Sequence, residues 1–108
     1  DVSKRSMLVR YGLPEDVGMR ELRAAGAVCD VIGQFIDIHG RPIDHPLNRR
    51  AIALPLRDLA RVPTVVFAAG GRHKTHALAA VLRGGFGSVI VCDEDTARAA
   101  AALARSGA

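Results

Sequence analysis

The segment that most constrains the architecture is residues 64–105, TVVFAAGGRHKTHALAAVLRGGFGSVIVCDEDTARAAAALAR. It holds two short continuous apolar runs, at 64–68 and 89–92, as expected of strands buried on both faces of a sheet. Between them, residues 72–83 have a helical repeat whose apolar side chains share one face: Leu78, Val81 and Leu82. This order predicts two neighbouring parallel strands joined by a right-handed helical crossover.

Glycine and aspartate residues mark where these elements begin and end. Gly70-Gly71 follows the first strand, and Gly84-Gly85 is placed to end the helix. Asp93 or Asp95 can cap a last alanine-rich helix, which we expect to run to about Arg105. The predicted fold class is therefore α/β, a Rossmann-like parallel sheet with flanking helices.

The first two thirds of the chain give weaker signals. A helix is expected from Pro14 to about Ala25, and residues 27–38 have the β-branched, alternating pattern of a strand or a strand-like loop. The remaining predicted elements are short: a turn at 39–42, a loop at 43–50, a strand at 52–54, and a helix at 56–62 that ends before Pro63.

Composition narrows the class of protein. The chain has 108 residues, 49% of them hydrophobic, so it is one domain or part of one and can bury a core. Its net charge is +4, but the 15 Lys and Arg residues are scattered and form no aromatic-interleaved strand, which argues against direct contact with nucleic acid. No apolar run approaches the ~20 residues of a membrane span. Cys29 and Cys92 lie in apolar surroundings, and we interpret them as buried free thiols in a reducing cytoplasm.

The strongest local candidate for a binding site is the turn at residues 68–74, between the first apolar strand and its helix. Ligands of open α/β sheets gather at this carboxyl end of the strands. Gly70 and Gly71 allow close backbone approach, N–H groups at the helix start favour an anion, and Lys74 adds a positive charge. A plain tight turn with a solvated Lys74 is the alternative. The turn matches neither G-x-G-x-x-G nor G-x-x-x-x-G-K-[ST], so no nucleotide cofactor is predicted.

Asp30 is the second candidate residue. Its carboxylate follows Cys29 and precedes Val31 in an apolar stretch, where burial without partners is costly. We expect it to accept hydrogen bonds from sugar hydroxyls, and the alternative is that it caps a turn or lies at an exposed strand end. The chain's four histidines include His73 and His76, one helical turn apart, but they lack the spacing of a zinc site, so no metal is predicted.

Several motifs, taken in order, resemble the sugar-binding domain of SorC/DeoR-type bacterial transcriptional regulators. They are LRAAGAVCDVIG at 22–33, FID at 35–37 before GRP at 40–42, DHPLNRR at 44–50, AGG at 69–71 with Lys74, and VCDEDTA at 91–97. Each motif alone is weak, but their order and spacing together are specific. The resemblance covers about residues 6–104 and matches the C-terminal half of that domain.

The resemblance implies a phosphorylated-sugar effector site in a fold similar to sugar-phosphate isomerases and CoA-transferase-like proteins. It places Gly70, Gly71 and Lys74 near the effector phosphate and Asp30 towards the sugar. Cys29 stands where the family usually has Gly. The first half of the effector domain and the helix-turn-helix domain that binds DNA are expected outside this chain, in a cytoplasmic homo-oligomer.

The expected function is therefore effector sensing by a transcriptional regulator, with no catalytic residues. The alternative is a fragment of a sugar-phosphate isomerase-like enzyme. Such an enzyme would need a base and a ring-opening acid near the turn at residues 68–74. The sequence offers Asp30 and His73 for those roles, but no pair of carboxylates. A helix-turn-helix encoded upstream would decide between the two.

Overall fold

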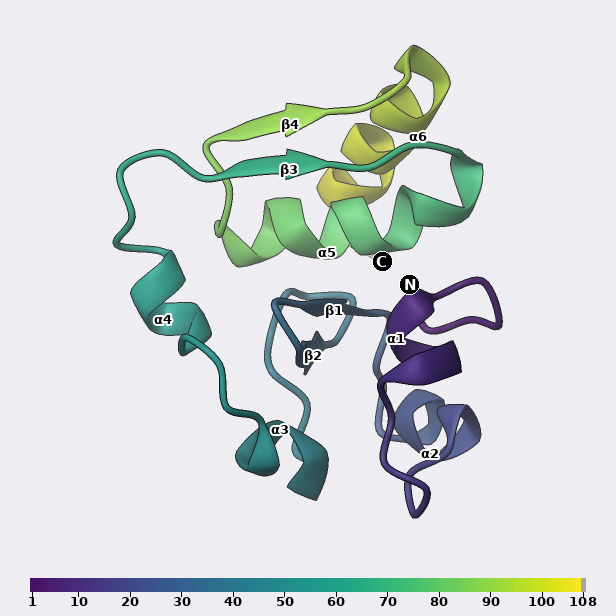
Figure 1. Ribbon diagram of the computed structural model, residues 1–108. Coiled ribbons are helices and arrows are strands. Elements are labelled where there is room, and N and C mark those ends of the chain that lie inside the picture. Colours follow the sequence, from purple (N-terminus) through teal and green to yellow (C-terminus); the bar gives the residue numbers. More distant parts are fainter. Residues whose placement is uncertain (108) are drawn as a thin grey trace.

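The predicted β-α-β-α unit is confirmed in the computed structural model, which describes residues 1–107. Strands β3 (Val66–Ala68) and β4 (Val89–Val91) are neighbours and run parallel. Between them, the 3-10 turn η1 (Arg72–Lys74) leads into helix α5 (Thr75–Gly84). Helix α6 (Glu94–Arg105) follows β4 and packs against α5 (Figure 1). The fold class is therefore α/β, as the apolar runs indicated.

The helix ends follow the sequence signals. Gly85 adopts the left-handed conformation, with φ at 67°, and ends α5. Of the two aspartates that could cap α6, Asp93 does so, because its Oδ2 accepts the N–H of Thr96 at 3.0 Å. These local contacts fix where α5 stops and α6 starts, and so they set how the two helices pack.

A second layer is built around an antiparallel hairpin in the first half of the chain. Strand β1 (Cys29–Val31) pairs with β2 (Gln34–Ile36) through a tight turn at 32–33. The hairpin lies against α5 on the side opposite to β3 and β4 (Figure 1). Helix α1 (Met7–Tyr11) lies beside the hairpin, and α2 (Met19–Ala24) lies on the side away from α5. Helix α5 is thus the central layer between a sheet and a hairpin.

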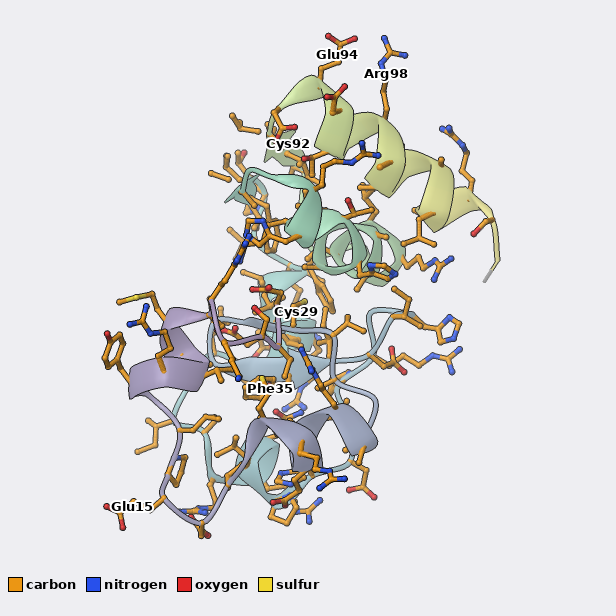
Figure 2. All side chains as sticks on the ribbon, turned by 90° about the vertical axis from the view of Figure 1, so that its right-hand side faces the viewer. Glu15, Cys29, Phe35, Cys92, Glu94 and Arg98 are labelled. Carbon is orange, nitrogen blue, oxygen red and sulfur yellow. The ribbon has the colours of Figure 1, made fainter. Side chains whose placement is uncertain are left out.

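The hairpin separates two hydrophobic cores because its side chains alternate between its two faces. Cys29 points towards α5, and Phe35 points away from it, towards α1 and α2 (Figure 2). The buried residues of the core against α5 are Cys29, Val31, Ile36, Leu56, Ala80, Val81 and Phe86. The buried residues of the other core are Val2, Val17, Leu22, Ala27, Phe35 and Ile43.

The loop after β2 is locked onto the end of α5. Gly40 has φ at 78°, and a Cβ there would lie 2.4 Å from backbone atoms of Gly84, so the two backbones meet directly. Next to this contact, Arg83 Nη1 donates to the carbonyl of Ile38 at 3.0 Å. The same guanidinium donates to two carbonyls in the last turn of α6, at 3.2 and 2.7 Å. One side chain therefore joins the hairpin layer to both helices.

The expected helix boundaries in the first half were partly wrong. Helix α2 begins at Met19 rather than Pro14, because Pro14 opens a turn in which its carbonyl accepts the N–H of Val17, and Gly18 is the N-cap. Residues 46–50, expected as loop, form helix α3 (Pro46–Arg50). His45 caps it through Nδ1, which accepts the N–H of Leu47 at 3.0 Å.

Two further expectations concern the connection to the sheet. The turn at 39–42 and a short helix, α4 (Leu56–Leu59), are present, and α4 ends before Pro63 as predicted. The strand expected at 52–54 is wrong, since these residues pair with no strand and Ile52 is fully exposed. A short apolar run needs a partner strand to become β-structure, and none of the residues at 1–107 supplies one here.

The burial expected for the parallel strands was also wrong. Phe67 and Ile90 pack towards α5, but on the opposite face Val66 and Val91 are each 57% exposed and Val89 is 45% exposed. The described chain covers one face of this sheet. Cys29 is buried as expected, whereas Cys92 is partly exposed, and both are free thiols. None of the helices within residues 1–107 is long and apolar enough to cross a membrane.

Candidate functional site

A cleft of about 450 Å³ lies where the N-terminal segment, β1, the end of β3 and α5 meet. Its volume is in the range of small-molecule sites. Its charged and hydroxyl-bearing lining residues are Asp1, Arg5, Ser6, Asp30 and Lys74. Its wall at the carboxyl end of β3 is formed by Ala68 and Ala69, the position where ligands of parallel sheets bind. Two of the predicted site residues, Asp30 and Lys74, therefore share one cleft although 43 residues separate them in sequence.

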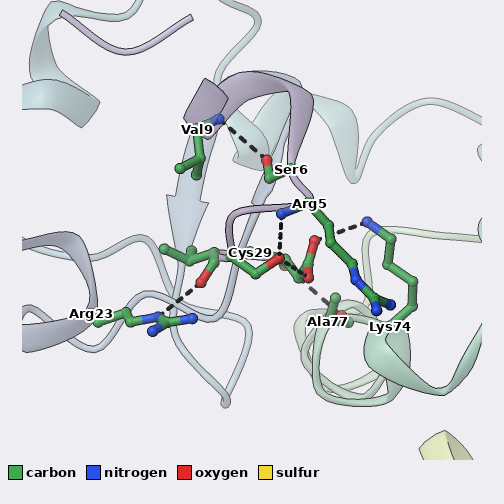
Figure 3. Close-up of polar contacts among 10 residues, drawn as sticks. Arg5, Ser6, Val9, Arg23, Cys29, Lys74 and Ala77 are labelled. Carbon is green, nitrogen blue, oxygen red and sulfur yellow. Dashed lines mark hydrogen bonds and ion pairs between the residues drawn. The ribbon is translucent and has the colours of Figure 1, made fainter. Parts of the chain in front are cut away.

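Lys74 is the last residue of η1 and is held at the cleft by an ion pair. Its Nζ lies 3.1 Å from Oδ1 of Asp1, and the hydroxyl of Ser3 donates to Oδ2 of Asp1 at 2.6 Å. The Lys74 and Asp1 side chains are only 29% and 12% exposed, so solvent screens this pair less than an open surface pair. Figure 3 shows Arg5 beside Lys74, and both side chains line the cleft.

Asp30 lies in the middle of β1, is partly exposed and is one of the residues that line the cleft. Within residues 1–107, its carboxylate forms no hydrogen bond or ion pair with another side chain or with the backbone. It therefore presents free acceptor oxygens to whatever enters the cleft. Hydroxyl groups of a ligand are suitable donors for such oxygens.

Cys29 forms part of the cleft wall, next to Asp30. Burial raises the pKa of its thiol to about 11, so the thiol is protonated at neutral pH. Its Sγ lies 4.0 Å from the carbonyl oxygen of Ala77 in α5, and Figure 3 shows this contact. A neutral, buried thiol is a poor nucleophile, and its contribution here is to pack β1 against α5.

In the glycine turn, the amide of Gly71 already has an acceptor within the chain. Gly71 has φ at 92°, a conformation that favours glycine, and its N–H donates to Oδ1 of Asp93 at 2.8 Å. This hydrogen bond, followed by those from Thr96, lowers the pKa of Asp93 to about 2. Within the described chain, neither Gly70 nor Gly71 lines the cleft. The turn instead joins the end of β3 to the start of α6, and of the three predicted phosphate-site residues only Lys74 reaches the cleft.

The histidines lie elsewhere. His73 is next to Lys74 in η1 but does not line the cleft within residues 1–107, so the structure does not bring together the Asp30 and His73 pair that an isomerase would require. No group of three or more His, Cys, Asp or Glu side chains in the described part of the chain is arranged to hold a metal. Asp1, Arg5 and Ser6 are the charged or hydroxyl-bearing cleft residues that sequence reasoning missed.

Comparisons with known sequences agree with the resemblance. Residues 1–100 match the family model "Putative sugar-binding domain". The transcriptional regulator LsrR of Klebsiella pneumoniae is 41% identical over 105 residues, which are 96% of this chain and 32% of that protein. LsrR of Escherichia coli O139:H28 is 42% identical over 75 residues, which are 68% of this chain and 24% of that protein. The chain thus spans about a quarter to a third of the length of these relatives.

Solved structures show the same fold. A DeoR family transcriptional regulator from Listeria monocytogenes matches with a TM-score of 0.79 and 30% identity over 91% of this chain and 40% of that one. The sorbitol operon regulator SorC of Klebsiella pneumoniae matches with a TM-score of 0.71 over 86% of this chain and 29% of that one, at 22% identity. The second likeness supports the fold alone.

Proposed function

The chain belongs to the sugar-binding domain family of SorC/DeoR-type transcriptional regulators, and from this membership we propose that it is the C-terminal part of a regulator's effector domain. Its cleft binds a phosphorylated sugar. Effector binding changes the DNA affinity of a helix-turn-helix domain that lies outside these residues. The whole regulator acts in the cytoplasm as a homo-oligomer.

The observation that carries this proposal is the meeting of Lys74 and Asp30 in one cleft of suitable size. Lys74 supplies a positive charge for the phosphate, and Arg5 adds a second one. Asp30 supplies unpartnered acceptor oxygens for sugar hydroxyls. The two ends of a sugar phosphate need these two kinds of group, held apart in the same cavity.

Gly70 and Gly71 belong to the proposed site because they shape the turn that carries Lys74. They redirect the chain from the Ala68-Ala69 wall of the cleft into η1, which brings Lys74 to the cleft. Because the Gly71 N–H already donates to Asp93, the phosphate in this proposal lies beside Lys74 rather than on the Gly71 amide.

A sensing role is favoured over an isomerase role by what surrounds Asp30. A general acid and a general base must both reach the substrate, and His73, the partner considered for Asp30, is not part of the cleft lining in residues 1–107. The neutral Cys29 thiol offers no nucleophile. Binding without turnover is the activity that this lining supports.

The test compares Lys74→Ala and Asp30→Asn in the full-length protein by calorimetric titration with a panel of sugars and their phosphate esters. Loss of a charge-assisted contact costs about 1.5–3 kcal/mol. Lys74→Ala should therefore weaken binding of the phosphate ester roughly ten- to hundredfold and remove the preference over the free sugar. Asp30→Asn should weaken binding of both forms and keep that preference.

The matched control is Arg57→Ala, which removes one exposed positive charge outside the cleft and should leave both affinities unchanged. Equal affinity of Lys74→Ala and the parent protein for the phosphate ester would show that the turn is only structural.

A further inference from the structure

The side chains that line the cleft include as many carboxylates as cations. Arg5 and Lys74 are countered by Asp1 and Asp30, and Lys74 is already paired with Asp1 at 3.1 Å. A phosphate group that enters the cleft therefore finds Lys74 already in an ion pair with Asp1. The like charge of the Asp1 carboxylate opposes any anion that approaches Lys74.

Asp1 is held in this position by contacts on both sides of its side chain. Ser3 donates to Oδ2 at 2.6 Å while Lys74 pairs with Oδ1. The following residue, Val2, is buried, its N–H donates to the carbonyl of Val28 at 3.1 Å, and its carbonyl accepts from Arg23 Nε at 2.8 Å (Figure 3). The backbone next to Asp1 is thus anchored to the hairpin layer, and the carboxylate is presented to the cleft.

We propose that Asp1 sets the charge selectivity of the cleft by acting as an internal substitute for the ligand's anionic group. The Asp1 carboxylate pairs with Lys74, and a phosphate displaces that carboxylate when it binds. This inference rests on the proposed function, because it takes Lys74 to be the phosphate contact. Its physical consequence is that Asp1 lowers the affinity for anions, so that a weakly held anion does not fill the cleft.

A positioning role for Asp1 makes the opposite prediction. A carboxylate that only orients the Lys74 ammonium would increase the affinity for a phosphate, and its removal would weaken binding. The sign of the change in affinity therefore separates a competing residue from a positioning residue.

The experiment measures binding of inorganic phosphate to the full-length protein, by calorimetry or by NMR titration, for Asp1→Asn and the parent. Asparagine keeps the size of the side chain and an oxygen that can accept from Ser3, but it removes the charge. We expect Asp1→Asn to bind phosphate about tenfold more tightly, the size expected when one like charge leaves a partly solvated site.

Asp16→Asn is the matched control. It removes a carboxylate from an exposed ion pair, Asp16 with Arg50 at 3.3 Å, outside the cleft lining. It changes the net charge by the same amount, so any general effect of charge appears in both variants. An unchanged or weaker affinity of Asp1→Asn relative to this control overturns the proposal.

Lys74→Ala, measured in the same series, separates this inference from the proposed function. If Lys74→Ala binds inorganic phosphate as tightly as the parent, the phosphate site is wrong and the role of Asp1 fails with it. If Lys74→Ala weakens binding while Asp1→Asn does not strengthen it, the site stands and only the competing role of Asp1 is wrong.

Discussion

Asp93 shows how one side chain can define both a turn and a helix. Its Oδ1 accepts the N–H of Gly71 at 2.8 Å, and its Oδ2 accepts the N–H and the hydroxyl of Thr96 at 3.0 and 2.8 Å. These contacts hold the glycine turn after β3 against the first turn of α6. The position of η1, and with it that of Lys74, therefore depends on a residue that follows β4.

Asp93→Ala should lower the midpoint of thermal unfolding by a few degrees, because the N-cap of α6 and the Gly71 contact are lost together. Asp95→Ala is the control, since Asp95 lies in the first turn of the same helix without capping it. Circular dichroism melts of both variants beside the parent protein measure the difference. An equal effect of the two substitutions would contradict the capping role.

The same contact predicts a pH dependence. The pKa of Asp93 is lowered to about 2, below its ordinary value of about 3.9 in an unfolded chain. The stabilisation is therefore fully present above about pH 5 and is lost as the pH falls through about 2. The difference in melting temperature between the parent and Asp93→Ala should shrink over this interval, and a difference that stays constant down to pH 2 would argue against an ionised cap.

At this scale the sequence singled out some of the residues that line the cleft and missed others. Lys74 and Asp30 were singled out because a charged group stood out against apolar or glycine-rich neighbours. Asp1 gave no such signal, since its partner Lys74 is 73 residues away. The hydrogen bond of the Gly71 amide gave no signal either, since its acceptor, Asp93, lies 22 residues further on. Contacts between residues so far apart in the sequence cannot be predicted from a local sequence pattern.

Among the helices and strands, α3 is the clearest case of an element that the sequence did not predict. Its five residues are too few to show a helical repeat, so residues 43–50 were expected to be a loop. The fold nevertheless uses this helix to fix the hairpin. The side chain of Asn48 accepts the N–H of Phe35 at 2.7 Å, and its Nδ2 donates to the carbonyls of Phe35 and Ile43 at 2.8 and 3.1 Å. The long, periodic α5 was predicted correctly because its repeat spans several turns.

Asn48→Ala should destabilise the protein by about 2–3 kcal/mol, because partly buried backbone groups of β2 lose their partners. Chemical denaturation measures this change in the free energy of unfolding. Arg49→Ala is the neighbouring control, since Arg49 pairs with Asp44 on the exposed surface, and its loss should cost about 0–1 kcal/mol. Similar values for the two variants would show that Asn48 does not hold the hairpin.

At the scale of the whole molecule, the parallel strands were predicted but their burial was not. A continuous apolar run predicts two covered faces, and that expectation takes account of the sequence of the strand alone. In the described chain α5 lies over the face that carries Phe67 and Ile90, while Val66, Val89 and Val91 are exposed. The matched relatives are three to four times longer than the region they share with this chain. We propose that residues outside these 108 cover the open face in the full-length regulator.

The 108-residue chain on its own should therefore self-associate through the open sheet face, because exposed contiguous apolar surface favours contact with a second copy. Sedimentation at micromolar concentration should show dimers or larger species. The double substitution Val66→Thr and Val91→Thr keeps β-branched side chains in both strands and should raise the monomer fraction. Ile52→Thr, which makes the same kind of change at an exposed residue outside the sheet, should leave the monomer fraction unchanged. A stable monomer of the unsubstituted chain would show that the sheet is stable in solution with only one face covered. The open face would then need no partner from the rest of the regulator.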